Sequence, residues 1–443
     1  MKPIKVFLLT IVLLFTGFLV HEAFASSKDK QKDKGFFGNA VTEEINITLA
    51  GKSGMEIRLE HSFGDIDIRP GENNTIYIKG EKRVTVKDSG ITEEFLKQME
   101  LEIIERPGKV TIKTNYPDDK YKEKAKNFSI SYTIKIPSDV QLSVNNSFGK
   151  IDIRDVSGEF TISNGFGSMT AYNLKGNLQL NNKFGSTTAE IIMGNAEISN
   201  EHGSLDINQV DGDLRAQSKF GSIKVHTISG DTIVSGGHGA IDCSKISGSA
   251  EITNSFGSVD CIDIGGKTFV RNSHAPVTVK DIRDETSVIT SFGKASIYNI
   301  KGNLMVENQH AAVEVEVIHG NAEINTSFGS ANIDQVDGDV VVINQHGSIT
   351  VTNILQTPTD KRRRVRLNTS FSPIKLSVPG TLSAEVSAQT SQGNFKCDFP
   401  LYVNMQNVDL SSISDQKIFG KIGDGKDLIE LEGSHANIYL EKY

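Results

Sequence analysis

The chain has 443 residues, with 47 basic and 55 acidic side chains and a net charge of −8 at pH 7. It contains 40 Gly, 10 Pro and no Trp, and it is rich in Val, Ile, Ser and Asn, as short strands with frequent corners require. This composition predicts an all-β fold, and the absence of a basic excess argues against a nucleic-acid partner.

The N-terminus predicts a secretory signal peptide over residues 1–25. Lys2 and Lys5 precede an apolar run, and Ala23-Phe24-Ala25 then fits cleavage before Ser26. An uncleaved membrane anchor is the alternative, but the run is short for a span and no cysteine follows it to carry a lipid. Cleavage would leave 45 basic and 54 acidic residues, a net charge of −9, in an exported protein without a membrane span. We expect it in the periplasm, at the cell surface or outside the cell.

Residues 26–40 predict a flexible polar stretch, and residues 41–147 an N-terminal β cap. The cap contains "HSFGDIDI" around Phe63, which is similar to the repeats that follow, and "ITEEFLKQM", which predicts a short helix. An atypical terminal repeat of this kind hides a strand edge that would otherwise recruit another chain.

Residues 148–354 carry a regular repeat of 18 residues. From Phe148 onward, Phe or His recurs at this spacing through His346 without an insertion or a deletion. Counting from Gly149 as position zero, positions 2, 4, 7 and 13 are apolar and the residues between them are mostly polar. A fixed period with this alternation predicts a β-solenoid with one continuous core. Twelve rungs about 4.8 Å apart would form a rod on the order of 55 Å long.

Two columns of the repeat predict structural roles. Position 9 is nearly always Gly, which indicates a corner whose backbone angles other residues resist. Position 15 is mostly Asn, and stacked amides can hydrogen-bond along the column and satisfy buried turn backbone. A column of ligand-binding amides is the alternative. These residues are Asn146, Asn164, Asn182, Asn200, Asn254, Asn272, Asn308 and Asn344.

A third column, at position 17, alternates Phe with His from Phe184 onward. The alternation of inward positions 11, 13 and 15 predicts that these rings point inward at a corner and stack on one another. An outward sugar-binding stripe and a metal column are alternatives, although histidines two rungs apart, about 9.5 Å, are too distant to share an ion. The column comprises Phe148, Phe166, Phe184, His202, Phe220, His238, Phe256, His274, Phe292, His310, Phe328 and His346.

Cys243 and Cys261 both occupy position 4, so we expect them to stack in neighbouring rungs with Cα atoms about 4.8 Å apart. That distance permits a disulfide, but parallel side chains in register point the same way. We therefore favour two buried thiols, with Cys397 as an unpaired third.

The phase of the repeat breaks after Ile354. Residues 355–366 predict a basic loop, in which Lys361, Arg362, Arg363, Arg364 and Arg366 are candidates for contact with an anionic surface. A purely solvated run of charges is the alternative. Residues 367–443 predict irregular β rungs and a C-terminal cap.

Three stretches of the chain resemble the bacterial putative-adhesin family, a domain of unknown function folded as a single-stranded parallel β-helix. They are "YTIKIPSDVQLSVNNSFGKIDI", the rungs of the form G-x-I-x-I-x-x-V-x-G-x-L-x-I-x-N, and "GDGKDLIELEGSHANIYLE". The resemblance spans nearly the whole chain after the signal peptide. It implies an exported protein associated with the cell envelope, favours a right-handed coil and brings no catalytic motif.

We therefore expect a non-enzymatic β-solenoid that binds or scaffolds at the cell envelope, with a glycan or another envelope protein as its partner. The sequence indicates no catalytic residues, metal ligands or cofactor, and outward acids such as Asp152 and Asp206 have no recurring basic partner. The regular rungs contain no inserted loop to build a cleft, so binding is expected on a flat strand face or at the basic loop. A carbohydrate-active lyase or glycosidase and a self-associating structural rod are the alternatives.

Overall fold

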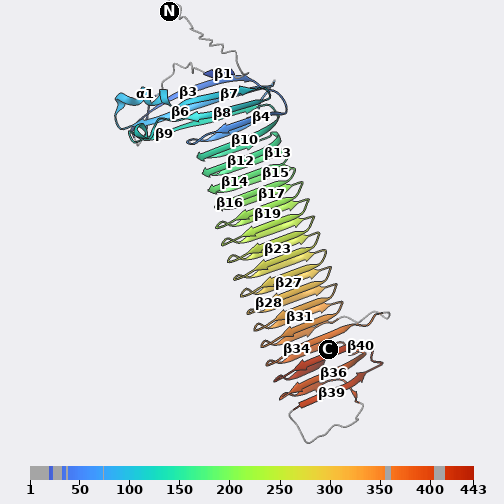
Figure 1. Cartoon of the computed structure of the whole chain (residues 1–443). Coiled ribbons are helices and arrows are strands. Elements are labelled where there is room, and N and C mark those ends of the chain that lie inside the picture. Colours follow the sequence, from blue (N-terminus) through green and yellow to red (C-terminus); the bar gives the residue numbers. More distant parts are fainter. Residues whose placement is uncertain (1–18, 23–31, 36–37, 73, 355–360, 404–414) are drawn as a thin grey trace, which may run out of the picture. The chain divides into compact units, whose positions relative to one another are not determined.

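A computed structural model describes residues 19–22, 32–35, 38–72, 74–354, 361–403 and 415–443. Strands account for 64% of the described residues and helices for 4%, which confirms the all-β prediction. The chain divides into two compact units, Met1–Phe166 and Gly167–Tyr443 (Figure 1). The predicted signal peptide lies outside the described residues except for Leu19–Glu22, which form strand β1. Within the described ranges, no helix is long and apolar enough to cross a membrane.

The first unit is built around strands that are not stacked in chain order. Strand β4 lies between β10 and β8, and β5 lies between β11 and β9, all in parallel register. Antiparallel strands β7, β6 and β3 complete the unit and cover the strand edges. Its elements are β1 (Leu19–Glu22), β2 (Lys32–Gly35), β3 (Gly38–Ala50), β4 (Met55–Glu60), β5 (Ile66–Pro70), β6 (Thr75–Val86), a 3-10 helix (Ser89–Ile91), α1 (Thr92–Gln98), β7 (Glu100–Arg106), β8 (Lys109–Asn115), α2 (Asp119–Lys122), β9 (Ala125–Ile136), β10 (Asp139–Phe148), β11 (Ile151–Arg154) and β12 (Ser157–Phe166).

Helix α1 confirms the short helix predicted from "ITEEFLKQM". It buries Phe95 and Leu96, and the Phe95 ring lies 5.4 Å from the ring of Phe128. Lys82 of β6 donates a hydrogen bond to the Leu96 carbonyl at 3.1 Å. These contacts fix the helix to the strands beside it.

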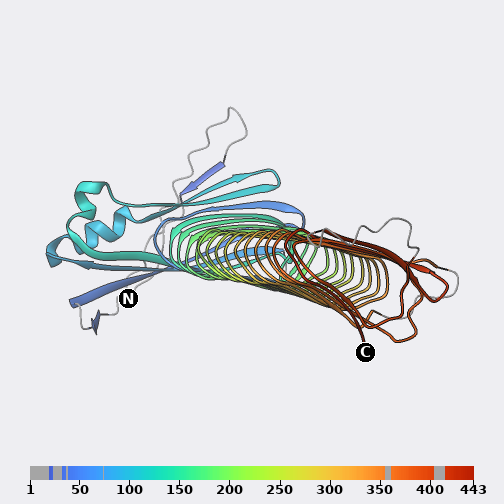
Figure 2. The same ribbon diagram turned by 90° about the horizontal axis from the view of Figure 1, so that it is seen from below.

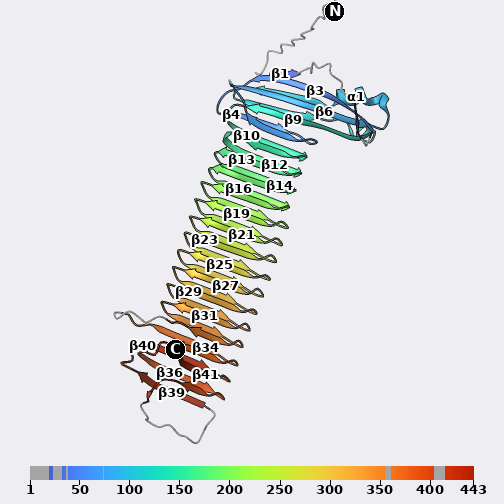
Figure 3. The same ribbon diagram turned by 180° about the vertical axis from the view of Figure 1, so that it is seen from behind.

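The second unit is a parallel β-solenoid with two strands in each turn, as the 18-residue repeat predicts. Each strand pairs with the strand 18 residues later, as in Met169 with Thr187 and Leu178 with Ala196. Figures 1 and 3 show the strands stacked side by side, and Figure 2 shows each coil as a flattened loop. Odd-numbered strands form one sheet and even-numbered strands the other.

The regular strands of this unit are β13 (Met169–Lys175), β14 (Leu178–Phe184), β15 (Thr187–Met193), β16 (Ala196–His202), β17 (Leu205–Val210), β18 (Leu214–Ser218), β19 (Ile223–Ile228), β20 (Thr232–Gly236), β21 (Ile241–Ile246), β22 (Ala250–Asn254), β23 (Val259–Ile264), β24 (Thr268–Asn272), β25 (Val277–Ile282), β26 (Thr286–Thr290), β27 (Ala295–Ile300), β28 (Leu304–Asn308), β29 (Val313–Ile318), β30 (Ala322–Thr326), β31 (Ala331–Val336), β32 (Val340–Asn344) and β33 (Ile349–Thr352). Odd strands bury positions 2, 4 and 7, and even strands bury positions 11 and 13, so the core lies between the two sheets. The predicted core columns are confirmed.

The corner glycines Gly158 and Gly176 confirm the prediction with φ angles of 129° and 135°, but the later glycines of the column have a different role. From Gly194 onward, the position-9 glycines do not adopt positive φ angles. A Cβ atom added to Gly194 would lie 2.5 Å from the Gly176 carbonyl oxygen of the preceding rung, so close stacking of the backbone excludes a side chain there. The left-handed residue is instead at position 6, where Ile191 and Val317 have φ angles of 59° and 60°.

The C-terminal strands form an irregular cap in which strand order and chain order differ. Strand β40 pairs with β34 on one side and β36 on the other, and β41 pairs in the same way with β35 and β37. Strand β39 then runs antiparallel to β36. These strands are β34 (Arg364–Thr369), β35 (Ile374–Val378), β36 (Ala384–Ser391), β37 (Phe395–Cys397), β38 (Tyr402–Val403), β39 (Asp415–Ile422), β40 (Asp427–Gly433) and β41 (Ile438–Lys442).

Candidate functional surfaces

The asparagine column is structural, as predicted, but its amides bond to the backbone. The side-chain amide of Asn254 donates to the carbonyls of Gly239 and Gly257 at 2.9 and 2.8 Å. Asn272 likewise donates to Gly257 at 3.0 Å and to Ala275 at 2.9 Å. Each of these amides therefore joins the corners of two neighbouring rungs, and the buried turn backbone is satisfied.

The aromatic column stacks as predicted, but its rings point outward, so the inward orientation was wrong. In the first unit, the ring centroids of Phe148 and Phe166 are 4.8 Å apart. In the second unit, neighbouring centroids from Phe184 to His346 are 4.5–5.4 Å apart with interplanar angles of 1–17°. Phe292 is 55% exposed. Most even strands end at position 15, so position 17 lies in the turn, where strand alternation no longer applies.

The column in the second unit extends two rings beyond the sequence prediction. Phe371 stacks on His346 at 5.1 Å, and His435 stacks on Phe371 at 5.4 Å. The short sequences "TSFS" and "GSHA" match the earlier rungs locally and could have identified both rings. Because neighbouring rings cover each other's faces, the column exposes ring edges along its length, and it has little face area on which a sugar could stack.

Cys243 and Cys261 are free and fully buried, as favoured from the sequence. They are directly opposite each other in β21 and β23. Burial raises the pKa of both thiols, which keeps them protonated and unreactive. Cys397 is free and partly buried.

The predicted basic loop is largely tied to acidic residues of the C-terminal cap. Residues 355–360 lie outside the described residues, and Arg364 and Arg366 belong to strand β34. Arg362 pairs with Glu385 at 2.8 Å, and Arg364 pairs with Glu430 at 2.7 Å.

Arg363 of the same run is 4% exposed, and its backbone N–H donates to Asp427. Its burial lowers the pKa of the guanidinium. Lys361 and Arg366 are exposed. Arg362 and Arg364 are exposed as well, although each is paired with an acidic residue, so four of the five candidates lie at the surface and contact with an anionic surface stays a prediction.

The first unit holds an ionic cluster that the sequence did not predict. Asp152 is 5% exposed and contacts Arg69 at 3.2 Å, Lys150 at 3.0 Å and Arg154 at 2.7 Å. Burial acts to raise the pKa of Asp152, but hydrogen bonds from Arg154 and Lys150 and the charge of Arg69 lower it to about 2. Asp152 therefore has three basic partners of its own, which the expectation of no recurring basic partner did not foresee, and the cluster fixes strands β5 and β11.

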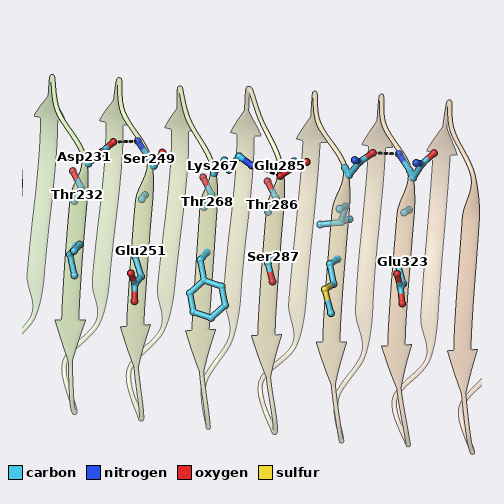
Figure 4. Close-up of a pocket in the computed structure, with 18 of the residues that line it drawn as sticks. Asp231, Thr232, Ser249, Glu251, Lys267, Thr268, Glu285, Thr286, Ser287 and Glu323 are labelled. Atoms are coloured by element: carbon cyan, nitrogen blue, oxygen red, sulfur yellow. Dashed lines mark hydrogen bonds and ion pairs between the residues drawn. The ribbon is translucent and has the colours of Figure 1, made fainter.

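A shallow groove crosses the even-numbered sheet of the second unit, from β20 to β32. Two rows of outward side chains border it, at positions 10 and 12, and the strand backbone at position 11 forms its floor (Figure 4). Its volume is about 810 Å³. The sequence predicted a flat face here. The depth of the groove was not predictable, because it depends on the sizes of the side chains that neighbouring strands place side by side. We call this feature the face groove.

The position-10 row of the face groove is partly a second polar ladder. The Asp231 carboxylate accepts a hydrogen bond from the Ser249 backbone N–H at 2.8 Å. The side-chain oxygen of Asn321 accepts one from the Asp339 backbone N–H at 2.9 Å. Lys267 pairs with Glu285 at 2.7 Å. The position-12 row alternates apolar with polar residues: Ile233, Glu251, Phe269, Ser287, Met305, Glu323 and Val341.

The described residues contain no group of three or more His, Cys, Asp or Glu side chains placed to hold a metal ion. No protein-family model matches the chain. No curated protein matches it either. One matching solved structure is a crystal structure of a putative cell adhesion protein from Clostridium sporogenes, with 8% sequence identity and a TM-score of 0.17. The match covers 91% of this chain and 100% of that one, but at this TM-score it supports no conclusion about function.

Proposed function

We propose that this chain is an exported, non-enzymatic β-solenoid that binds a component of the bacterial cell envelope. The observation that carries the proposal is the face groove, an open surface about seven strands long that can hold an extended partner. Export is supported by the basic, apolar and small-residue segments before Ser26.

The arrangement of acids in the face groove favours binding over glycoside cleavage. Glycosidases place two carboxyl groups roughly 5–9.5 Å apart across one bond. Glu251 and Glu323 of the position-12 row are four strands apart, roughly 19 Å along the sheet. Asp231 and Asp339 accept hydrogen bonds from the backbone of the next strand, which gives them a role in holding the sheet together.

The test is a binding screen of the mature protein against isolated envelope fractions and purified glycans. We expect saturable binding to at least one envelope fraction. A variant with Lys361→Ser and Arg366→Ser, two exposed basic residues of the 361–366 segment, should bind as the wild type does. If no fraction retains the folded protein, the binding function is wrong. If the wild type binds and this variant does not, the partner surface is the basic segment and not the sheet face.

A further inference from the structure

The dimensions of the face groove favour a thin, extended occupant. Its two bordering rows are two residues apart along each strand, about 6.6 Å, and it crosses seven strands, roughly 30 Å. An α-helix with its side chains is about 10–12 Å wide and would not enter between the rows. An extended polymer lying across the strands would fit.

The floor of the groove argues against an extended peptide. The backbone there belongs to interior strands of a parallel sheet, where each strand pairs with a neighbour on both sides. Strand addition requires a free edge, which this part of the face does not present. A peptide crossing the strands would leave its own amide groups without partners from the sheet.

The position-12 row has a period of two rungs. The side chains of Ile233, Phe269, Met305 and Val341 recur every second strand, about 9.6 Å apart, with Glu251, Ser287 and Glu323 between them. A linear glycan whose successive rings alternate in orientation has the same two-unit character. Its C–H ring faces suit the apolar side chains, and its hydroxyl groups suit the carboxylates and Ser287.

The charge of the groove selects among such glycans. Its border carries five carboxylates, Asp231, Glu251, Glu285, Glu323 and Asp339, against one ammonium, Lys267, which is already paired with Glu285. Another cation lies beside the groove at Arg271, over the Phe269 ring at 5.6 Å. The excess of negative charge favours a cationic chain and opposes an acidic polysaccharide.

From these features we propose that the face groove binds a linear amino-sugar glycan that carries free ammonium groups. Glu251 and Glu323 would contact the ammonium groups, and Phe269 and Met305 would pack against ring faces. This inference rests on the proposed function, because it names the class of envelope component that the groove would bind.

The test is calorimetric titration of the mature protein with a glucosamine hexasaccharide. An N-acetylglucosamine hexasaccharide and a lysine hexapeptide serve as comparison ligands. We expect the glucosamine chain to bind most tightly, with an affinity that falls as salt is raised. The exposed pair Glu251→Gln and Glu323→Gln should weaken binding at least about threefold. Phe269→Ser with Met305→Ser should weaken it as well. The matched pair Asp206→Asn and Asp242→Asn, exposed on the other sheet, should have no effect.

Several outcomes would overturn this proposal. Failure of the folded protein to bind the glucosamine chain would do so, as would equal affinity for the lysine peptide, which would mean that charge alone is recognised. Equal weakening by the groove and control pairs would locate binding elsewhere. If envelope fractions retain the wild type while the glucosamine chain does not bind, only the ligand class is wrong; if neither binds, the proposed function fails too.

Discussion

At the scale of single residues, His61 occupies a position of the asparagine column and brings a titratable group to it. It lies three residues before Gly64, where the regular rungs carry Asn. Its side chain is 5% exposed, and its Nδ1 lies 3.0 Å from the Thr114 hydroxyl. Burial lowers the pKa of His61 to about 4, so the imidazole is neutral in the folded chain at neutral pH.

This histidine should make the first unit sensitive to acid. Its folded pKa is below the unfolded value of 6.5, so its contribution is complete above pH 6.5 and is lost as pH falls toward 4, by up to about 3 kcal/mol. His61→Asn should remove this loss, and exposed His238→Asn should not. Urea unfolding followed by tyrosine fluorescence at pH 7 and pH 5 measures both. An unchanged pH dependence in His61→Asn would show that other groups cause the acid sensitivity.

The three cysteines give a second test at this scale. Thiol titration of the denatured, unreduced protein should find three free thiols, because Cys243 and Cys261 are buried side by side without a bond. One free thiol would mean that this pair is bridged.

At the scale of the element, the corner of each rung depends on the asparagine column. Asn254→Ala would remove two hydrogen bonds and leave the carbonyls of Gly239 and Gly257 without this donor. We expect a loss of about 1–3 kcal/mol in the free energy of unfolding. The control is Asn332→Ala, an exposed residue of β31, which should have little effect. Equal urea midpoints for the two variants would contradict a structural role for the column.

The strands were predictable from the sequence because their inward, mostly apolar positions recur every 18 residues. The outward rings of the aromatic column were not, since the residue at position 17 lies beyond the end of the strand in most rungs. Phe371 was missed because it lies 25 residues after His346 instead of 18, and His435 was missed because β40 inserts between strands that precede it in the chain. Partners such as Glu430, 66 residues from Arg364, could not be read from local sequence.

At the scale of the whole molecule, the chain must be exported before it can bind an envelope component. Mass spectrometry of the protein recovered from outside the cytoplasm should find an N-terminus at Ser26, because the small residues before it fit the cleavage site. An intact Met1 in the membrane fraction would show that the segment is retained as an anchor.

We propose that the mature chain binds an envelope glycan without converting it, and an assay for new sugar ends released from such a glycan decides between binding and catalysis. Purified protein incubated with each bound glycan should release no reducing or unsaturated ends above the rate without protein. Steady release that is abolished by a single outward change, such as Glu323→Gln, would overturn the non-enzymatic function and identify the chain as an enzyme.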